Sequence, residues 1–203
     1  FEKILPVAIF NEKFDNKSSL RMFYFTSTTL PSITQLQNVV NNTNPLLLST
    51  GNPGLNQSFN QVFITRYGKT NTDKAHSFFV FFTAGLTQNY IGNSTIIADK
   101  DSTVTGGFKL AKGSQLTYPV NLNNEWNTKV FATYGIPFDA ISSNLNLNGG
   151  VSYNSTPGLL NDQMNYANTY AINPGLVLSS NINENVDFTL SYNSTENIVK
   201  NTL

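Results

Sequence analysis

The chain has 203 residues, and its 12 acidic and 12 basic residues make up only 12% of the sequence and leave no net charge. Soluble domains usually carry about 25% charged residues, so this composition argues against a wholly wetted surface. It also excludes several classes of protein, since there is no basic cluster for nucleic acid, no cysteine for disulfides or thiolate metal sites, and no apolar run long enough for a transmembrane helix. Polarity comes mainly from Asn, Ser and Thr, beside 15 Phe and 9 Tyr, a mixture typical of a β-barrel wall or of a secreted adhesin.

Apolar and polar residues alternate with period two along most of the chain, which predicts β-strands rather than helices. The clearest run is 76–90, where Phe78, Val80, Phe82 and Leu86 fall on one face. Such runs have about the ten residues that cross a bilayer at a tilt. In chain order, the eight predicted strands are about 4–14, 19–28, 58–67, 76–90, 125–135, 144–155, 168–179 and 186–196.

The connections between these strands alternate in length. Residues 15–18, 68–75, 136–143 and 180–185 are short connections, whereas 29–57, 91–124 and 156–167 are longer. Short turns on one side and long loops on the other are typical of transmembrane barrels, with the short turns in the periplasm. The sequence therefore predicts an all-β fold, an antiparallel transmembrane β-barrel segment of about eight up-and-down strands.

The same alternation gives the strands a direction. The first strand runs towards a periplasmic turn and the eighth runs back out, so both chain ends should lie on the extracellular side. A complete barrel of this kind should begin and end in the periplasm. We therefore expect residues 1–203 to be one partial outer-membrane β-barrel domain, whose export signal lies upstream or has been removed. Its eight strands should form an open sheet whose first and last strands are edges.

Two sets of side chains are expected to contact the membrane. The residues predicted to face lipid are Phe78, Val80, Phe82, Leu86, Val186, Phe188 and Leu190. Aromatic residues near strand ends are predicted to lie at the membrane interfaces. The alternative is that these aromatic residues only pack against their neighbours in the sheet. These interface aromatics are Trp126, Tyr134, Tyr153, Tyr170 and Tyr192.

Several stretches carry a family resemblance. They include Leu30-Pro31-Ser32-Ile33-Thr34-Gln35, Gly51-Asn52-Pro53-Gly54-Leu55, Tyr134-Gly135-Ile136-Pro137 and the run from Asn181 to Phe188. Together they resemble the C-terminal barrel region of TonB-dependent outer-membrane receptors, in the form of the outer membrane β-barrel family found in Bacteroidetes. In those receptors the Gly-Asn-Pro motif usually continues with Asp, where this chain has Gly54. Pro31, Gly51, Asn52 and Pro53 are expected to form the corresponding extracellular-loop motif.

The resemblance implies a barrel of about 22 strands with an N-terminal plug, of which only eight strands would be present here. It implies a receptor that binds a ligand outside and imports it when a TonB-type energy-coupling protein pulls on the absent plug. The neutral Asn, Ser and Thr of the strands favour a polar ligand, and the Asn, Tyr and Thr of the long loops suit a sugar or a peptide. A surface lipoprotein and the outer-membrane lipid are the other implied partners. A structural or adhesive barrel without transport remains an alternative, as does a soluble, secreted all-β module.

No residue pattern indicates an enzyme. His76 is the only histidine, and without a second metal-ligand type or an ordered base nearby it is expected to be a solvated residue at a strand start. Asp99 and Asp101 lack the alternating ligands of a calcium loop, so a solvated loop tip is expected there. We expect no catalytic residues, no metal and no cofactor.

Overall fold

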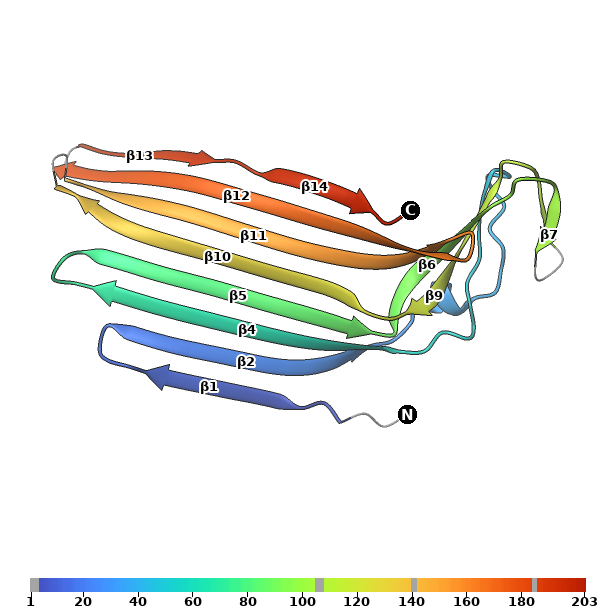
Figure 1. Ribbon diagram of the computed structural model, residues 1–203, viewed down its shortest axis with the longest axis horizontal. Helices are drawn as coiled ribbons and strands as arrows, with labels where there is room; N and C mark the ends of the chain where they lie inside the picture. The colour runs from blue at the N-terminus through green and yellow to red at the C-terminus, as the bar shows by residue number, and fades with distance from the viewer. Residues whose placement is uncertain (1–3, 105–107, 140–141, 184–185) are drawn as a thin grey trace.

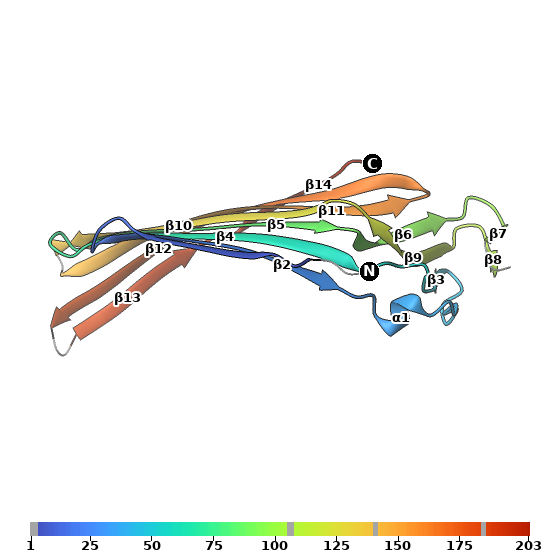
Figure 2. The ribbon, with the colours of Figure 1, turned by 90° about the horizontal axis from the view of Figure 1, so that it is seen from below.

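The computed structural model is one long, curved sheet with a group of short elements at one end (Figure 1). The structure describes residues 4–104, 108–139, 142–183 and 186–203. Seen along its edge, the sheet is a single layer, and no described element packs over either face of the long strands (Figure 2). The long strands therefore owe their apolar contacts to their neighbours within the sheet alone.

Long antiparallel strands form the body of the sheet and follow one another as simple neighbours. Their spatial order is β1-β2-β4-β5-β10-β11-β12, with β13 and β14 both paired to β12. The bounds are β1 Val7–Lys13, β2 Ser18–Thr29, β4 Ser58–Asn71, β5 His76–Gln88, β10 Glu125–Phe138, β11 Ser143–Leu160, β12 Gln163–Asn183, β13 Val186–Asn193 and β14 Glu196–Asn201. The predicted long strands overlap these elements throughout.

The predicted count of about eight strands is wrong, because the sheet contains 12 strands. Three of the additional strands lie in segments that were predicted as loops: β3 (Leu47–Ser49), β6 (Tyr90–Ile97) and β9 (Gln115–Leu122). They pair in the order β6-β9-β3 at the outer end of the sheet. Beside them lie the short helix α1 (Ile33–Leu36) and the separate pair β7 (Ser102–Val104) and β8 (Phe108–Leu110). We call α1, β3 and β6–β9, with their connecting loops, the outer cluster.

The last long strand is divided in two by a proline in its neighbour. The backbone N–H of Ser194 donates to the carbonyl of Pro174 in β12 at 3.0 Å. In an antiparallel pair the N–H and C=O of one residue point to the same side, so the donor that proline lacks would also have faced this strand. The ladder breaks at that point, and β13 and β14 pair separately with the two halves of β12.

The connection between β11 and β12 is also shorter than predicted. Residues 156–167 were expected to form a long loop, but the two strands continue to Leu160 and Gln163. A tight turn joins them at Asn161 and Asp162, whose φ angles are 49° and 62°. Asn and Asp tolerate this left-handed region better than other residues with a side chain. The result is a hairpin that extends into the outer cluster, where Leu159 and Leu160 pair in parallel with β6.

The sheet is open and does not close into a barrel, which confirms the predicted open sheet. Among the described residues, β1 pairs only with β2, and β13 and β14 pair only with β12. No ladder of hydrogen bonds therefore joins the first long strand to the last. Both termini lie at the end of the sheet that carries the outer cluster (Figure 1).

The buried apolar core lies in the outer cluster and not in the long sheet. It consists of Leu48, Ala98, Leu110 and Leu116, with Tyr118 packed against them. None of the helices in the described ranges is long and apolar enough to cross a membrane. The long strands, in contrast, leave many of their large apolar side chains exposed.

Candidate functional site

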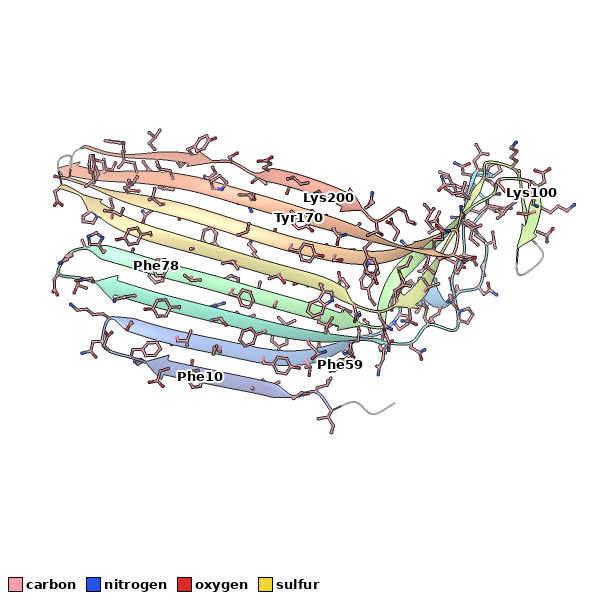
Figure 3. The ribbon with its side chains drawn as sticks, viewed as in Figure 1. Phe10, Phe59, Phe78, Lys100, Tyr170 and Lys200 are labelled. Atoms are coloured by element: carbon pink, nitrogen blue, oxygen red, sulfur yellow. The ribbon has the colours of Figure 1, made fainter. Side chains whose placement is uncertain are left out.

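The strand register sorts the side chains of the long sheet onto two faces. Residues directly opposite each other on neighbouring strands point to the same side, so each register pair extends a face across the sheet. Following Phe78 through these pairs defines an apolar face with members on every long strand. Phe10, Phe59, Phe78 and Tyr170 mark it on β1, β4, β5 and β12 (Figure 3).

The residues predicted to face lipid fall together on this apolar face. Phe78, Val80, Phe82 and Leu86 of β5 share it with Phe188 and Leu190 of β13. The seventh predicted residue is Val186, whose side chain lies outside those that the structure describes. Contact of this face with lipid remains a prediction.

Aromatic side chains form a continuous chain near the short turns. The ring centroids of Phe14 and Tyr67 lie 6.5 Å apart, those of Tyr67 and Phe78 6.2 Å, and those of Phe78 and Tyr134 6.3 Å. His76 stacks on Tyr134 at 5.9 Å. The histidine begins β5, as expected of a strand start, but it is half-buried against this ring rather than fully solvated. Edge-on contacts at these distances stabilise aromatic pairs beyond their buried area.

The other predicted interface aromatics also lie on the apolar face, on β10, β12 and neighbouring strands. Tyr153 and Tyr170 are register partners whose ring centroids are 5.0 Å apart, and the Tyr153 hydroxyl donates to Oδ1 of Asn168 at 2.9 Å. Trp126 and Tyr192 are 45% and 65% exposed. The structure therefore groups these side chains on one face, and their position at a membrane interface remains a prediction.

The opposite face, which we call the polar face, is hydrophilic without being strongly charged. On β11 it carries Asn144, Asn146, Asn148, Ser152 and Asn154, which alternate with the apolar residues on the other side. Its cations in the middle of the long strands are Arg21, Arg66 and Lys129. Apolar side chains also occur on it, chiefly on β1, β2, β4 and β5. Amide and hydroxyl groups of this kind offer hydrogen bonds to water or to a neutral solute.

The motif that was predicted to lie in an extracellular loop holds the outer cluster together. The backbone N–H groups of Gly51 and Asn52 donate to the carbonyls of Gln37 and Gln35 at 3.0 and 2.6 Å, just after and within α1. A Cβ on Gly51 would lie 2.3 Å from the Gln37 carbonyl oxygen, so only glycine fits. The Asn52 side chain donates to the carbonyl of Pro119 in β9 at 3.0 Å.

The two prolines of the motif lie beside the start of α1 and in the turn that follows Asn52. Pro31 precedes Ser32, the N-cap of α1, whose side chain forms a capping box with Gln35. Pro53 lies in the turn after Asn52, which accepts from the backbone of Gly54 at 2.9 Å. The motif is thus a structural clamp between α1, β3 and β9, and its partners are other segments of the chain.

A cleft of about 400 Å³ opens in the outer cluster beside this clamp. Its walls come from the α1 segment, β3, β6 and β9, and none of the lining residues is charged. Amide and hydroxyl side chains such as Asn93 and Thr117 line it together with the half-buried ring of Tyr118. The sequence did not single out this cleft, because its walls come from segments that lie far apart in the chain.

Charged groups gather at the short turns rather than in the cleft. Asp15 accepts from the Ser18 hydroxyl at 2.8 Å and from the Lys17 backbone at 2.7 Å, and these hydrogen bonds hold the pKa of its carboxyl below the usual range. The Lys17 side chain forms an ion pair with Asp73 of the next turn. At the opposite end, burial and the nearby Glu125 raise the pKa of Tyr90.

Asp101, expected at a solvated loop tip, accepts a backbone hydrogen bond from Lys112 at 2.8 Å. In the described ranges no three His, Cys, Asp or Glu side chains come together as metal ligands.

A model of the outer membrane protein beta-barrel family matches residues 1–201, which is nearly the whole chain. The chain belongs to this outer membrane β-barrel family. No curated protein matches it. Membership places the protein in the bacterial outer membrane, and it supports the predicted barrel class.

In a member of this β-barrel family, the two faces of the sheet are expected to meet different surroundings. A barrel strand presents alternate side chains to lipid and to the barrel interior. The apolar and polar faces have the composition that each of these surroundings requires. The outer cluster then stands at the end opposite the short turns, where a barrel carries its long loops.

Proposed function

We propose that this chain forms wall strands and outer loops of a TonB-dependent outer-membrane receptor that imports a polar ligand. The observation that carries the proposal is the division of the long sheet into an apolar face and a polar face with few charges. The apolar face suits lipid hydrocarbon, and the polar face suits a water-filled interior. In this proposal the predicted lipid-facing residues meet the acyl chains.

The open edges favour a wall that continues beyond these strands. Unpaired backbone groups are costly in hydrocarbon, so spanning sheets need a partner at each edge. β1 and the β13–β14 pair present such edges. We therefore propose that further strands complete a wide barrel, in which a TonB-type energy-coupling protein acts through a plug domain.

The neutral cleft is the proposed first contact for the ligand. Its hydroxyl and amide groups, beside the ring of Tyr118, suit a neutral oligosaccharide better than a charged peptide, because a buried charge would find no partner there. Around it, Ile33 and Val39 are 77% and 74% exposed, which suits contact with a surface lipoprotein. Ligand transfer would then proceed along the polar face.

The test is energy-dependent uptake by cells that express the complete gene. Fluorescein-labelled neutral oligosaccharides and peptides are offered to energised cells, to cells treated with a protonophore and to cells that lack the energy-coupling protein. We expect surface binding in all three and uptake only in energised cells with an intact coupling protein. Binding without energy-dependent uptake of any probe would contradict import and favour the alternative, a non-transporting structural or adhesive barrel.

Two tryptophan variants test the cleft itself. Asn93→Trp places a large ring in the cleft, and we expect it to reduce surface binding of the labelled oligosaccharide at least about tenfold, as for the loss of a well-filled contact. Asn42→Trp is the matched control, because Asn42 is exposed in the same cluster and does not line the cleft. Equal binding by the two variants would remove the cleft from the proposal.

A further inference from the structure

Two arginines lie directly opposite each other on the polar face. Arg21 of β2 is the register partner of Arg66 of β4. Arg21 in turn lies opposite Asn11 of β1, and Arg66 lies opposite Phe81 of β5. Directly opposed residues have Cβ atoms only about 5 Å apart. The two arginine side chains therefore start from neighbouring positions on this face, and both are exposed.

No described anion balances this pair of positive charges. Across the ranges that the structure describes, the ion pair found is that of Lys17 with Asp73, which lies at the turns. Glu12 is adjacent to Asn11 in β1, but strand alternation directs it to the other face. Like charges directly opposite each other destabilise a sheet, so this arrangement is unfavourable unless an anion joins it.

The neighbouring rings support the geometry of such a site. The guanidinium carbon of Arg66 lies 5.6 Å from the centroid of the Phe81 ring, within the range of a cation–π contact. Phe131 is the next residue in the same row, opposite Phe81. The Phe81 ring therefore lies against one side of the Arg66 guanidinium, while the side chain stays exposed and open to a ligand.

We propose that Arg21 and Arg66 form an anion-binding site on the polar face, which takes a carboxylate or phosphate group. Guanidinium groups bind both anions through paired N–H donors, and two long arginine side chains on neighbouring strands can turn towards one anion. The Asn11 amide lies next in the row as a further donor. This site goes beyond the proposed import function and does not depend on it.

The anion has two sources with the same chemistry. One is a free solute anion that enters the interior from the medium. The other is an acidic side chain from a further segment of polypeptide that lies against the polar face. The two differ in what happens when an arginine is removed: a free anion loses its site, whereas an internal carboxylate loses its partner and the protein loses stability.

The experiment uses the protein purified from outer membranes in a zwitterionic detergent at low salt. Inorganic phosphate and succinate are titrated into the wild type and into Arg21→Gln, Arg66→Gln and Lys129→Gln, with calorimetry and thermal unfolding as readouts. Lys129→Gln is the matched control, because Lys129 is exposed on the same face and its opposite residues, Thr83 and Ser152, are neutral. It removes the same charge without touching the pair.

For a free anion, we expect phosphate or succinate affinity to fall about tenfold or more in each arginine variant and less than about twofold in Lys129→Gln. Without added anion the arginine variants should melt no lower than the wild type, because repulsion is relieved. For an internal carboxylate, the wild type should bind neither anion and both arginine variants should melt lower than Lys129→Gln. Equal anion affinity in all four proteins, or no binding together with equal melting temperatures, would overturn the site.

Discussion

The long sheet and the outer cluster differ in the exposure of their apolar side chains. In the cluster, Leu110 is 1% exposed and packs within a small core. In the sheet, Leu190 and Val151 are 62% and 53% exposed on a face that no described element covers. A bare apolar surface would promote aggregation in water, and the proposed contact with hydrocarbon would avoid that exposure. The cluster thus buries its apolar side chains within the chain, whereas the sheet leaves them for the lipid contact that we propose.

The largest expected effect is the loss of the cluster core. Leu110→Ala should destabilise the outer cluster by about 2–5 kcal/mol, the usual cost of truncating a fully buried leucine. Hydrogen–deuterium exchange of the purified protein should show faster exchange in β9 and unchanged exchange in β10 and β11. The control is Leu47→Ala, since Leu47 lies in the same cluster but is 55% exposed. Equal acceleration by both variants would mean that the cluster has no core of its own.

A charge on the apolar face should act on the sheet and leave the cluster alone. Phe82→Lys should cost about 2–4 kcal/mol if its face lies in mid-membrane, and less folded protein should reach the outer membrane. Thr83→Lys is the control, because Thr83 is the next residue of β5 and lies on the polar face. Heat-modifiable migration of outer-membrane fractions measures both. Equal assembly of the two variants would refute the predicted facing.

A methyl group on Gly51 should strain the clamp of the outer cluster. Gly51→Ala is expected to cost about 1–3 kcal/mol, as for overpacking elsewhere, because the new Cβ meets the carbonyls of Gln37 and Gln35. Susceptibility of the loops to added protease on whole cells should rise. Gly149→Ala is the matched control in the sheet, where nothing lies within 4 Å of the new atom. If Gly149→Ala exposes the loops as much as Gly51→Ala, the clamp is not what orders them.

The smallest expected effect is a pH dependence of the β1–β2 turn. Because hydrogen bonds lower the pKa of Asp15, they should stabilise the turn at neutral pH and be lost as the pH falls below the usual value of 3.8. The protection factor of the Lys17 amide, measured by hydrogen exchange in detergent, should fall over that range. In Asp15→Asn the protection should no longer change with pH. An unchanged protection factor in the wild type would contradict the assignment.

The long strands could be predicted because each carries its own pattern. Period-two alternation over many residues fixes both the strand and the face of every side chain, and Phe78 to Leu86 is the clearest case. The open sheet was predicted from the alternation of turn lengths and from the width of the barrel that the family resemblance implies. The loop motif was also recognised, but the sequence could not show that Gly51 and Asn52 bind α1 and β9 rather than a ligand.

The outer cluster could not be predicted from local pattern. β3 and β9 pair in parallel although their register partners Leu48 and Leu116 lie far apart in the chain, and no short-range signal specifies such a contact. The turn at Asn161 and Asp162 did carry a local signal, since both residue types favour it, yet its polar surroundings resemble a loop. The arginine pair was missed because it exists only once the register of β2 and β4 is known.

The hairpin of β11 and β12 connects the long sheet to the outer cluster without a break in pairing. Its strands run unbroken from the short turns to Leu160, paired at every position along the 18 residues of β11, and its tip is bonded to β6. A continuous two-stranded ribbon of this kind transmits force along its length. Force applied to β6 would therefore pass directly into the ladder of the long strands, because the pairing of β11 and β12 has no break between them.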